Sequence, residues 1–327
     1  MNATLMKRLF RVLQDGSPSE VNAVCQRIVE EEKKRGHTQV AQDLETILGA
    51  SAGVVRPVPK QSLRPLPTSR RDSAPLLTEI SVEKLRHHMV LPPSVESRFS
   101  RIEKEFAARS RLAKHGLRPR QRVLLYGPPG CGKNLGAERL AWHTGLPLRK
   151  VRFDNLLSSY FGETMSNLRR VFDAAHETPC ALFLDECDTL ASARNARNDV
   201  GEVSRITNAL LELLEDYRGD GLVIAATNLD AGLDPALFRR FDEVLRIPLP
   251  GIGEVVQLLT TTLSPIGKEP KLSLEVLAAE MDGMSRSDVV HVAQSAAKLA
   301  VLAGRKRVSE NDLRQALTEA HERHSSR

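Results

Sequence analysis

The stretch "RVLLYGPPGCGKNLG", residues 122–136, decides the fold of this chain. It begins with an apolar run that suits a buried parallel strand. The residues that follow match the pattern G-x-x-x-x-G-K-[ST] at every position but the last, and they open a helix. Glycines in such a turn let backbone N–H groups point into a concave anion site, to which the helix N-terminus adds its dipole. We therefore predict a phosphate loop formed by Gly127, Pro128, Pro129, Gly130, Cys131, Gly132, Lys133, Asn134 and Leu135.

Asn134 is the one departure from this pattern, because a serine or threonine hydroxyl is expected to meet Mg²⁺ there. An amide carbonyl is an acceptable ligand for magnesium by type, but the asparagine side chain is one atom longer and magnesium demands near-ideal octahedral geometry. The loop glycines and Lys133 are intact. We therefore expect nucleotide to bind, with a preference for diphosphate or with slow turnover.

Polar residues follow two further apolar runs, "CALFLDE" at 180–186 and "LVIAATN" at 222–228. Asp185 is predicted to hold magnesium, usually through water, and Glu186 to act as the general base on the attacking water. Asn228 is predicted to position that water, although a strand-end asparagine is also a common turn former.

The segment "LDPALFRRFDEV", residues 233–244, contains Arg239 and Arg240. A guanidinium can stabilise charge on a transferring phosphoryl group and can be supplied by a neighbouring subunit. Both arginines could also be ordinary surface ion-pair residues.

The chain alternates apolar strand-like runs with helical stretches, which predicts a parallel sheet with helices on both faces. We predict an N-terminal helical domain at residues 1–50, a basic, proline-rich linker at 51–84, a large α/β domain at 85–249 and a small helical lid domain at 250–327. The helix starts are marked by capping boxes at Ser17–Glu20, Ser285–Asp288 and Ser309–Asp312.

Composition excludes several classes of protein. No apolar run approaches the ~20 residues that a membrane span needs, and the N-terminus lacks the apolar block of a secretory signal. The four cysteines form no C-x-x-C pair, which favours reduced thiols and a cytoplasmic protein. A net charge of +6 over 327 residues is only a mild excess, so it argues weakly for nucleic acid.

Residues 85 to 320 resemble an AAA-family ATPase module, through the motifs "GPPGCGK", "FLDE", "ATN", "DPALFRRFD" and "GMSRSDVVHVAQSAAKLAV" in this order. The resemblance implies a P-loop NTPase sheet in the order 5-1-4-3-2, a helical lid, and ATP or ADP with Mg²⁺ as cofactors. It also implies assembly into a ring, usually a homo-hexamer, with nucleotide between subunits.

The same resemblance assigns Arg239 or Arg240 as the arginine that reaches the neighbouring subunit's nucleotide. The family usually has two arginines separated by two residues, whereas here they are adjacent, so both remain candidates. Arg286 lies near the position where many members of the wider superfamily have a second sensor arginine.

The segment "LLSSYFGETMSNLRRVF", residues 156–172, resembles the pore loop of protein-remodelling members of the family. Tyr160 matches the aromatic that grips the substrate and Phe161 its neighbour. An aromatic ring can pack against any polypeptide and so gives a grip that tolerates sequence variation. The alternative is an aromatic side chain folded back into the core.

The sequence thus predicts a cytoplasmic, bacterial-type ring ATPase that unfolds or remodels protein substrates, with turnover impaired by Asn134. The N-terminal helices and basic linker would recruit a substrate, an adaptor or a separate protease. One alternative is a nucleotide-binding switch or scaffold that does not cycle. Another is a DNA-directed regulator, which the basic linker supports slightly although no nucleic-acid-binding module is evident.

Overall fold

The structure is a computed structural model that describes residues 66–69, 73–156, 161–187, 200–228, 238–270 and 272–325. The chain divides into two compact units, Met1–Pro65 and Leu66–Arg327, and every described residue belongs to the second unit. The predicted N-terminal domain, the first part of the predicted linker and Tyr160 lie outside the described residues.

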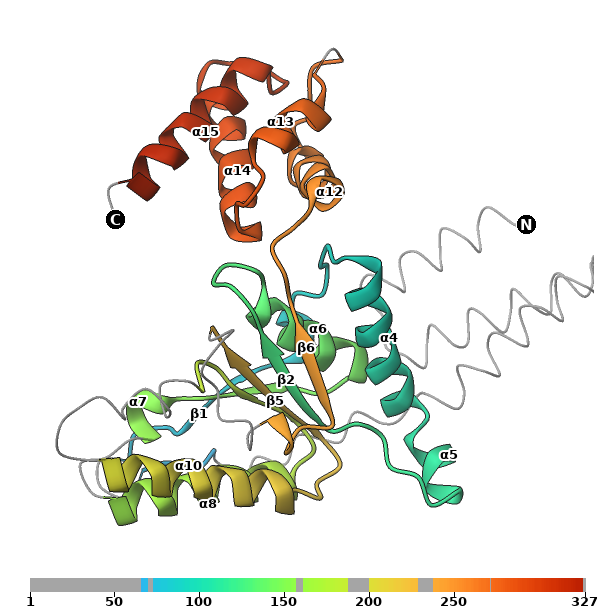
Figure 1. Ribbon diagram of the computed structural model, residues 1–327, viewed down its shortest axis with the longest axis vertical. Coiled ribbons are helices and arrows are strands. Elements are labelled where there is room, and N and C mark those ends of the chain that lie inside the picture. The colour runs from blue at the N-terminus through green and yellow to red at the C-terminus, as the bar shows by residue number, and fades with distance from the viewer. Residues whose placement is uncertain are drawn as a thin grey trace, which may run out of the picture. The chain divides into compact units, whose positions relative to one another are not determined.

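A six-stranded sheet with the order β1-β3-β4-β5-β2-β6 organises the α/β part of this unit (Figure 1). Its strands are β1 Leu77–Ile80, β2 Arg122–Tyr126, β3 Leu148–Val151, β4 Ala181–Leu184, β5 Leu222–Thr227 and β6 Glu243–Arg246. Strands β2 to β6 are parallel to their neighbours among these five. Numbered in chain order, these five strands follow the order 5-1-4-3-2, which confirms the predicted fold class.

Strand β1 extends the sheet beyond the prediction, because it pairs antiparallel with β3 at the edge of the sheet. It lies in the stretch that the sequence analysis assigned to the linker. Leu76 and Leu77 are almost fully buried in the core there, and Leu77 is in register with Val151. Full burial of a leucine side chain stabilises a fold by roughly 1.5–3 kcal/mol, so this segment is part of the folded domain.

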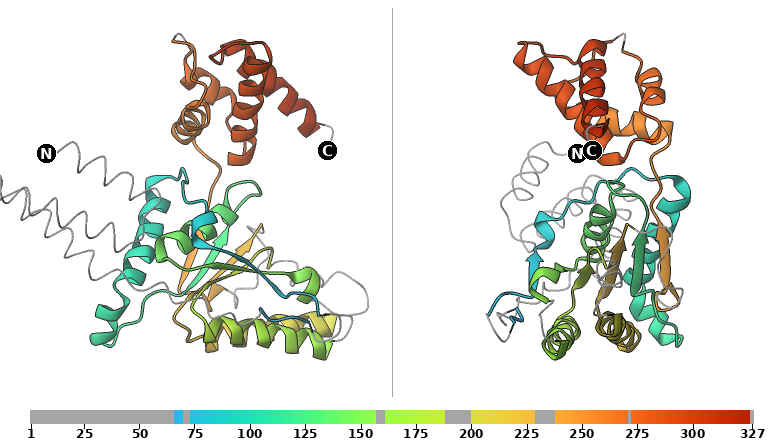
Figure 2. Two further views of the ribbon diagram at one scale, coloured as in Figure 1. Left: turned by 180° about the vertical axis from the view of Figure 1, so that it is seen from behind. Right: turned by 60° about the vertical axis from the view of Figure 1, so that its left-hand side comes forward.

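Helices cover both faces of the sheet (Figures 1 and 2). Helices α8 Phe161–Glu177 and α10 Val200–Asp216 pack on one face, and α4 Pro93–Ala107 and α6 Lys133–Thr144 on the other. Alternate residues of β2 pack into the buried clusters on opposite faces of the sheet. Leu124 lies in the cluster with α8 and α10, whereas Val123 and Leu125 lie in the cluster with α4 and α6. The shorter elements of the α/β part are the 3-10 helix η1 Val82–Lys84, α5 Arg109–Lys114 and α7 Phe153–Leu156.

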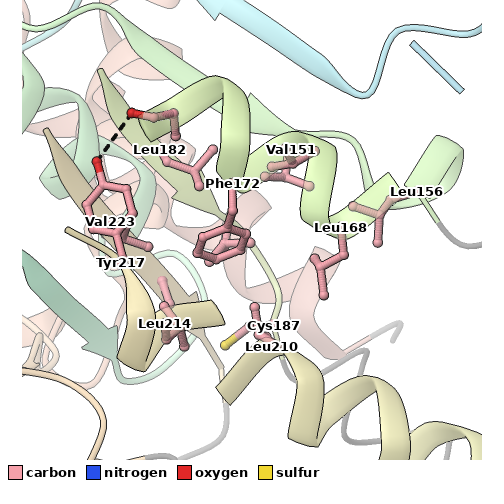
Figure 3. Close-up of a cluster of buried hydrophobic side chains, with 14 of the residues drawn as sticks. Val151, Leu156, Leu168, Phe172, Leu182, Cys187, Leu210, Leu214, Tyr217 and Val223 are labelled. Atoms are coloured by element: carbon pink, nitrogen blue, oxygen red, sulfur yellow. Dashed lines mark hydrogen bonds between the residues drawn. The ribbon is translucent and has the colours of Figure 1, made fainter. Parts of the chain in front are cut away.

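Figure 3 shows the core beneath α8 and α10. Leu168 and Phe172 of α8 and Leu210 and Leu214 of α10 pack over the sheet in this buried cluster. Tyr217 closes the cluster beyond the end of α10, and its hydroxyl donates a hydrogen bond to the carbonyl oxygen of Ala175, 3.5 Å away. Burial raises the pKa of Tyr217, so it stays neutral.

The lid contains α12 Ile252–Leu263, α13 Leu274–Glu280, α14 Arg286–Leu302 and α15 Glu310–Ser325, which share a separate apolar core. Both predicted capping boxes of the lid are present. The backbone N–H of Asp288 donates to Oγ of Ser285, and the N–H of Asp312 to Oγ of Ser309. Within the described residues, no helix is both long and apolar enough to cross a membrane.

Candidate nucleotide site

The phosphate loop connects β2 to α6 and takes backbone conformations that favour glycine. Gly127 has φ 138°, and a Cβ atom there would lie 2.3 Å from the carbonyl oxygen of Ile247. Gly130 has φ 74°, and its Cβ would lie 2.4 Å from the hydroxyl oxygens of Ser285 and Ser287 in the lid. Both positions therefore require glycine for close approach as well as for left-handed backbone.

Lys133 is the first residue of α6, and its side chain folds over the loop. Its Nζ donates hydrogen bonds to the carbonyl oxygens of Gly127 and Pro128, at 2.8 and 2.9 Å. The residue is buried, which is unusual for a lysine unless it is paired. The loop carbonyls thus hold an ammonium group where the outer phosphates of a nucleotide are expected.

The carboxylate of Asp185, directly after β4, is contacted by two donors. Nδ2 of Asn134 lies 3.0 Å from Oδ2 of Asp185, and Nζ of Lys150 lies 2.7 Å from the same oxygen. The structure therefore brings together the two predicted metal ligands, Asn134 and Asp185. Lys150 was missed by the sequence analysis. The available signal was a lysine inside a four-residue strand, β3, whose other three residues are buried.

This arrangement does not fit a divalent cation as it stands. Magnesium binds through oxygen, whereas Asn134 presents its NH₂ group and Lys150 its ammonium to the carboxylate of Asp185. An amide oxygen beside that carboxylate would be repelled by it, which fixes the orientation of the Asn134 side chain.

Glu186, the predicted base, is exposed and has φ 53°. Left-handed backbone is uncommon for a residue other than glycine, and such strain tends to persist where the surrounding structure enforces it, often at functional sites. The backbone N–H of Cys187 donates to the carbonyl oxygen of Ala226, 3.0 Å away, and so ties this turn to β5.

Asn228 is exposed and directly follows β5. Since Leu184 of β4 is in register with Ala225 of β5, Asp185, Glu186 and Asn228 leave the sheet at the same edge. The phosphate loop leaves β2 at that edge too, because β2 and β5 are parallel with Tyr126 opposite Thr227. The predicted base and the predicted water-positioning amide thus follow neighbouring strands beside the phosphate loop.

The two candidate arginines differ in their surroundings. Arg240 forms an ion pair with Glu215 of α10, with 2.5 Å between Nη1 and Oε2. Arg239 is exposed and has no ion pair with any residue that the structure describes. The structure therefore separates the two candidates: Arg239 is exposed, whereas Arg240 joins α10 to the turn before β6.

Arg286 connects the lid to the α/β part. Its Nε donates to the carbonyl oxygen of Val90, 3.0 Å away, and its guanidinium also donates to the carbonyl of Pro248. Burial lowers the pKa of Arg286 and raises that of Cys131 in the phosphate loop, with which it interacts. These contacts show Arg286 fastening the lid; its predicted role as a sensor of nucleotide stays a prediction.

Two further segments border the loop and were missed by the sequence analysis. The backbone N–H of Ser287, in the first turn of α14, donates to the carbonyl oxygen of Gly130 at 3.0 Å. Met89 lies against the other end of the loop, where its Cε would be 3.1 Å from a Cβ on Gly132. The start of a lid helix and the segment before α4 thus frame the loop, and neither carries a local sequence pattern that indicates this.

The predicted pore loop is only partly within the described residues, since Tyr160 is outside them. Phe161 is the first residue of α8, and Gly162, which follows, is exposed with open space around it. Glu163 accepts a hydrogen bond from Oγ of Ser69, 3.4 Å away, which joins the start of α8 to the segment before β1.

Comparison with known proteins agrees with this geometry. The sequence profile of the ATPase family associated with various cellular activities (AAA) matches residues 123–249, which run from β2 to the end of the α/β part. The chain is also 36% identical over 315 residues to an uncharacterized AAA family ATPase, y4kL, of Sinorhizobium fredii (strain NBRC 101917 / NGR234). That similarity covers 96% of this chain and 93% of the relative.

Proposed function

Because this chain belongs to the AAA family of ATPases, we propose that it is a ring-forming ATPase that unfolds or remodels protein substrates, with hydrolysis slowed by Asn134. Family membership implies nucleotide binding and ATP hydrolysis; the action on proteins is the proposal. The observation that supports the hydrolysis step is the shared edge of the sheet, where the phosphate loop, Glu186 and Asn228 lie together. This is the arrangement that phosphoryl transfer to water needs.

Each residue has a chemical task in this proposal. The loop amides and Lys133 bind the phosphates, and Glu186 takes a proton from the attacking water. Asn228 orients that water, and Arg239 of one subunit stabilises charge on the nucleotide of the next. Asn134 and Lys150 occupy the carboxylate of Asp185, so magnesium would reach this carboxylate only by displacing them.

The proposed ring is a cytoplasmic homo-hexamer with Tyr160 and Phe161 at its pore. The N-terminal helices of residues 1–50 would present an adaptor, a substrate or a separate protease to the ring. The support for this part is the match of residues 156–172 to the pore loop of remodelling members of the family, together with the exposed Gly162 at the start of α8.

A nucleotide-binding switch is the second candidate, and one observation favours it. Asp185 is engaged by Asn134 and Lys150, and a site whose acid is already neutralised can bind nucleotide without turning it over rapidly. In that case nucleotide binding would control the assembly of subunits, and ATP hydrolysis would not drive the movement of a substrate.

Substitution of Tyr160 tests the remodelling function. In an Asn134→Thr background, Tyr160→Ala should abolish substrate-stimulated hydrolysis and the unfolding of a tagged protein, because the gripping ring is lost. Tyr160→Phe should retain most of both, since the ring face rather than the hydroxyl makes the contact. Ring assembly with ADP, observed in particle images, should persist in both variants.

Two outcomes would contradict the proposal. If Tyr160→Ala unfolds substrate as well as its parent does, substrate is not threaded past this loop and the switch becomes the better hypothesis. If Tyr160→Ala lowers the free energy of unfolding by about 3 kcal/mol or more, the side chain belongs to the core instead.

A further inference from the structure

Lys150 is the one residue of strand β3 that is not buried, and its side chain contacts Asp185 after the neighbouring strand β4. In β3 it stands between Arg149 and Val151, and its Cα is in register with Phe183 of β4. Leu148, two residues earlier, packs in the core with α6, so the side chain of Lys150 projects from the same face of the sheet. Its Nζ lies 5.7 Å from the centre of the Phe183 ring and extends past it to Asp185.

Asn134 reaches the same carboxylate from helix α6. It belongs to the first turn of α6, directly after Lys133, so its position is fixed by the phosphate loop. Its amide and the ammonium of Lys150 both contact Oδ2 of Asp185, at 3.0 and 2.7 Å. A hydroxyl-bearing residue is absent at 134, and a cation is present beside Asp185, in one connected cluster.

A second carboxylate, that of Glu138, also interacts with Lys150. Glu138 lies one helical turn after Asn134 on α6 and is nearly buried. Arg86 holds it through its backbone N–H and its Nε, each 3.0 Å from Oε2 of Glu138. Lys150 adds a favourable electrostatic interaction with Glu138. Lys150 is therefore placed between two carboxylates, one of them already paired, with its side chain 40% exposed beside the phosphate loop.

We propose that Lys150 supplies the positive charge that a divalent cation would otherwise bring to this site, so that the protein binds nucleoside diphosphate without magnesium. This rests on the proposed nucleotide site. A lysine ammonium is a compact point charge on a flexible stem, and it can contact a phosphate oxygen while Asp185 holds it. Lys133 and Lys150 then face the phosphates from the loop and from β3.

Binding of a fluorescent ADP (mant-ADP) with EDTA and with Mg²⁺ tests this proposal. The dissociation constant of the unaltered protein should change by no more than about threefold between the two conditions, a difference well under 1.4 kcal/mol. Lys150→Met should weaken binding in EDTA by roughly tenfold, which is ~1.4 kcal/mol, and magnesium should recover part of the loss. Lys150→Arg should bind in EDTA nearly as the unaltered protein does.

Two further variants sharpen the experiment. Lys114→Met removes an exposed lysine of α5 and should leave mant-ADP affinity unchanged in both conditions, which controls for net charge. Asn134→Thr combined with Lys150→Met restores a hydroxyl and removes the competing cation, so its affinity should depend strongly on magnesium. Far-ultraviolet circular dichroism of each variant checks that it is folded.

The proposal is overturned if the unaltered protein loses more than about thirtyfold in affinity when EDTA replaces magnesium. It is equally overturned if folded Lys150→Met binds mant-ADP in EDTA as tightly as the unaltered protein, since Lys150 would then contribute nothing to nucleotide binding. Binding that requires magnesium defeats this inference but leaves the proposed ATPase standing. Absence of binding in both conditions defeats the proposed function itself.

Discussion

Asn134→Thr is the substitution that most directly probes how this site works. Asn134 donates one hydrogen bond to Asp185, at 3.0 Å, and threonine removes that N–H donor while offering a hydroxyl. A hydrogen bond to a charged group contributes roughly 1.5–3 kcal/mol, and the lower end applies because Asn134 is exposed to water. If that contact must be given up as charge develops during hydrolysis, its removal lowers the barrier by about 1.4 kcal/mol and raises kcat about tenfold.

The assay is phosphate release at saturating ATP, with mant-ADP binding measured in parallel. Asn134→Ala is the matched control, because it removes the same hydrogen bond without supplying a hydroxyl. It should raise kcat by a similar factor, and any further increase in Asn134→Thr measures what the hydroxyl adds. Equal kcat values for the unaltered protein and Asn134→Thr, with nucleotide bound in both, would refute the reasoning and show that the Asn134–Asp185 contact does not limit turnover.

Two other predictions follow from ion pairs in the structure. Arg239→Ala should abolish hydrolysis and spare mant-ADP binding. Arg240→Ala should mainly lower the melting temperature, because Arg240 forms an ion pair with Glu215. Normal phosphate release by Arg239→Ala would show that Arg239 does not act on a neighbouring nucleotide. Hydrogen bonding from Arg305 lowers the pKa of Asp312 from 3.8 to about 2, so this carboxylate stabilises the fold above pH 4 and the contribution is lost as pH falls from about 4 to 2. Asp312→Asn should lower the free energy of unfolding at pH 7 by about 1–2 kcal/mol, a figure reduced from the full pKa shift because Arg305 is exposed to solvent. It should also flatten the acid unfolding curve between about pH 4 and 2. An unchanged curve in circular dichroism would contradict this.

The parts of the fold that could be predicted are those written in local sequence. Strands β2 and β5 are apolar runs because both of their faces are covered, and the loop after β2 carries glycines because a side chain at Gly127 would strike Ile247. The capping boxes at Ser285 and Ser309 are reciprocal contacts within four residues, so they too are visible in the sequence.

The parts that were missed depend on partners distant in sequence. Strand β1 pairs with β3 some seventy positions later, and its short apolar stretch is surrounded by prolines and arginines that suggest a linker. The contacts of Arg286 were also missed, because its guanidinium is bound to carbonyls of Val90 and Pro248, which only the folded chain brings to it.

Lys150 shows most clearly why a single substitution in a motif cannot be judged alone. Taken alone, Asn134 is a poor ligand for magnesium, which predicts slow ATP hydrolysis. Together with Lys150, it becomes one of two donors that satisfy Asp185, and a buried or half-buried carboxylate that is satisfied carries no penalty for lacking a metal. A site degraded by drift would be expected to leave Asp185 without a compensating charge. The presence of a lysine 2.7 Å away argues instead that the loss at residue 134 is compensated, and that the phosphate loop still has a ligand to bind.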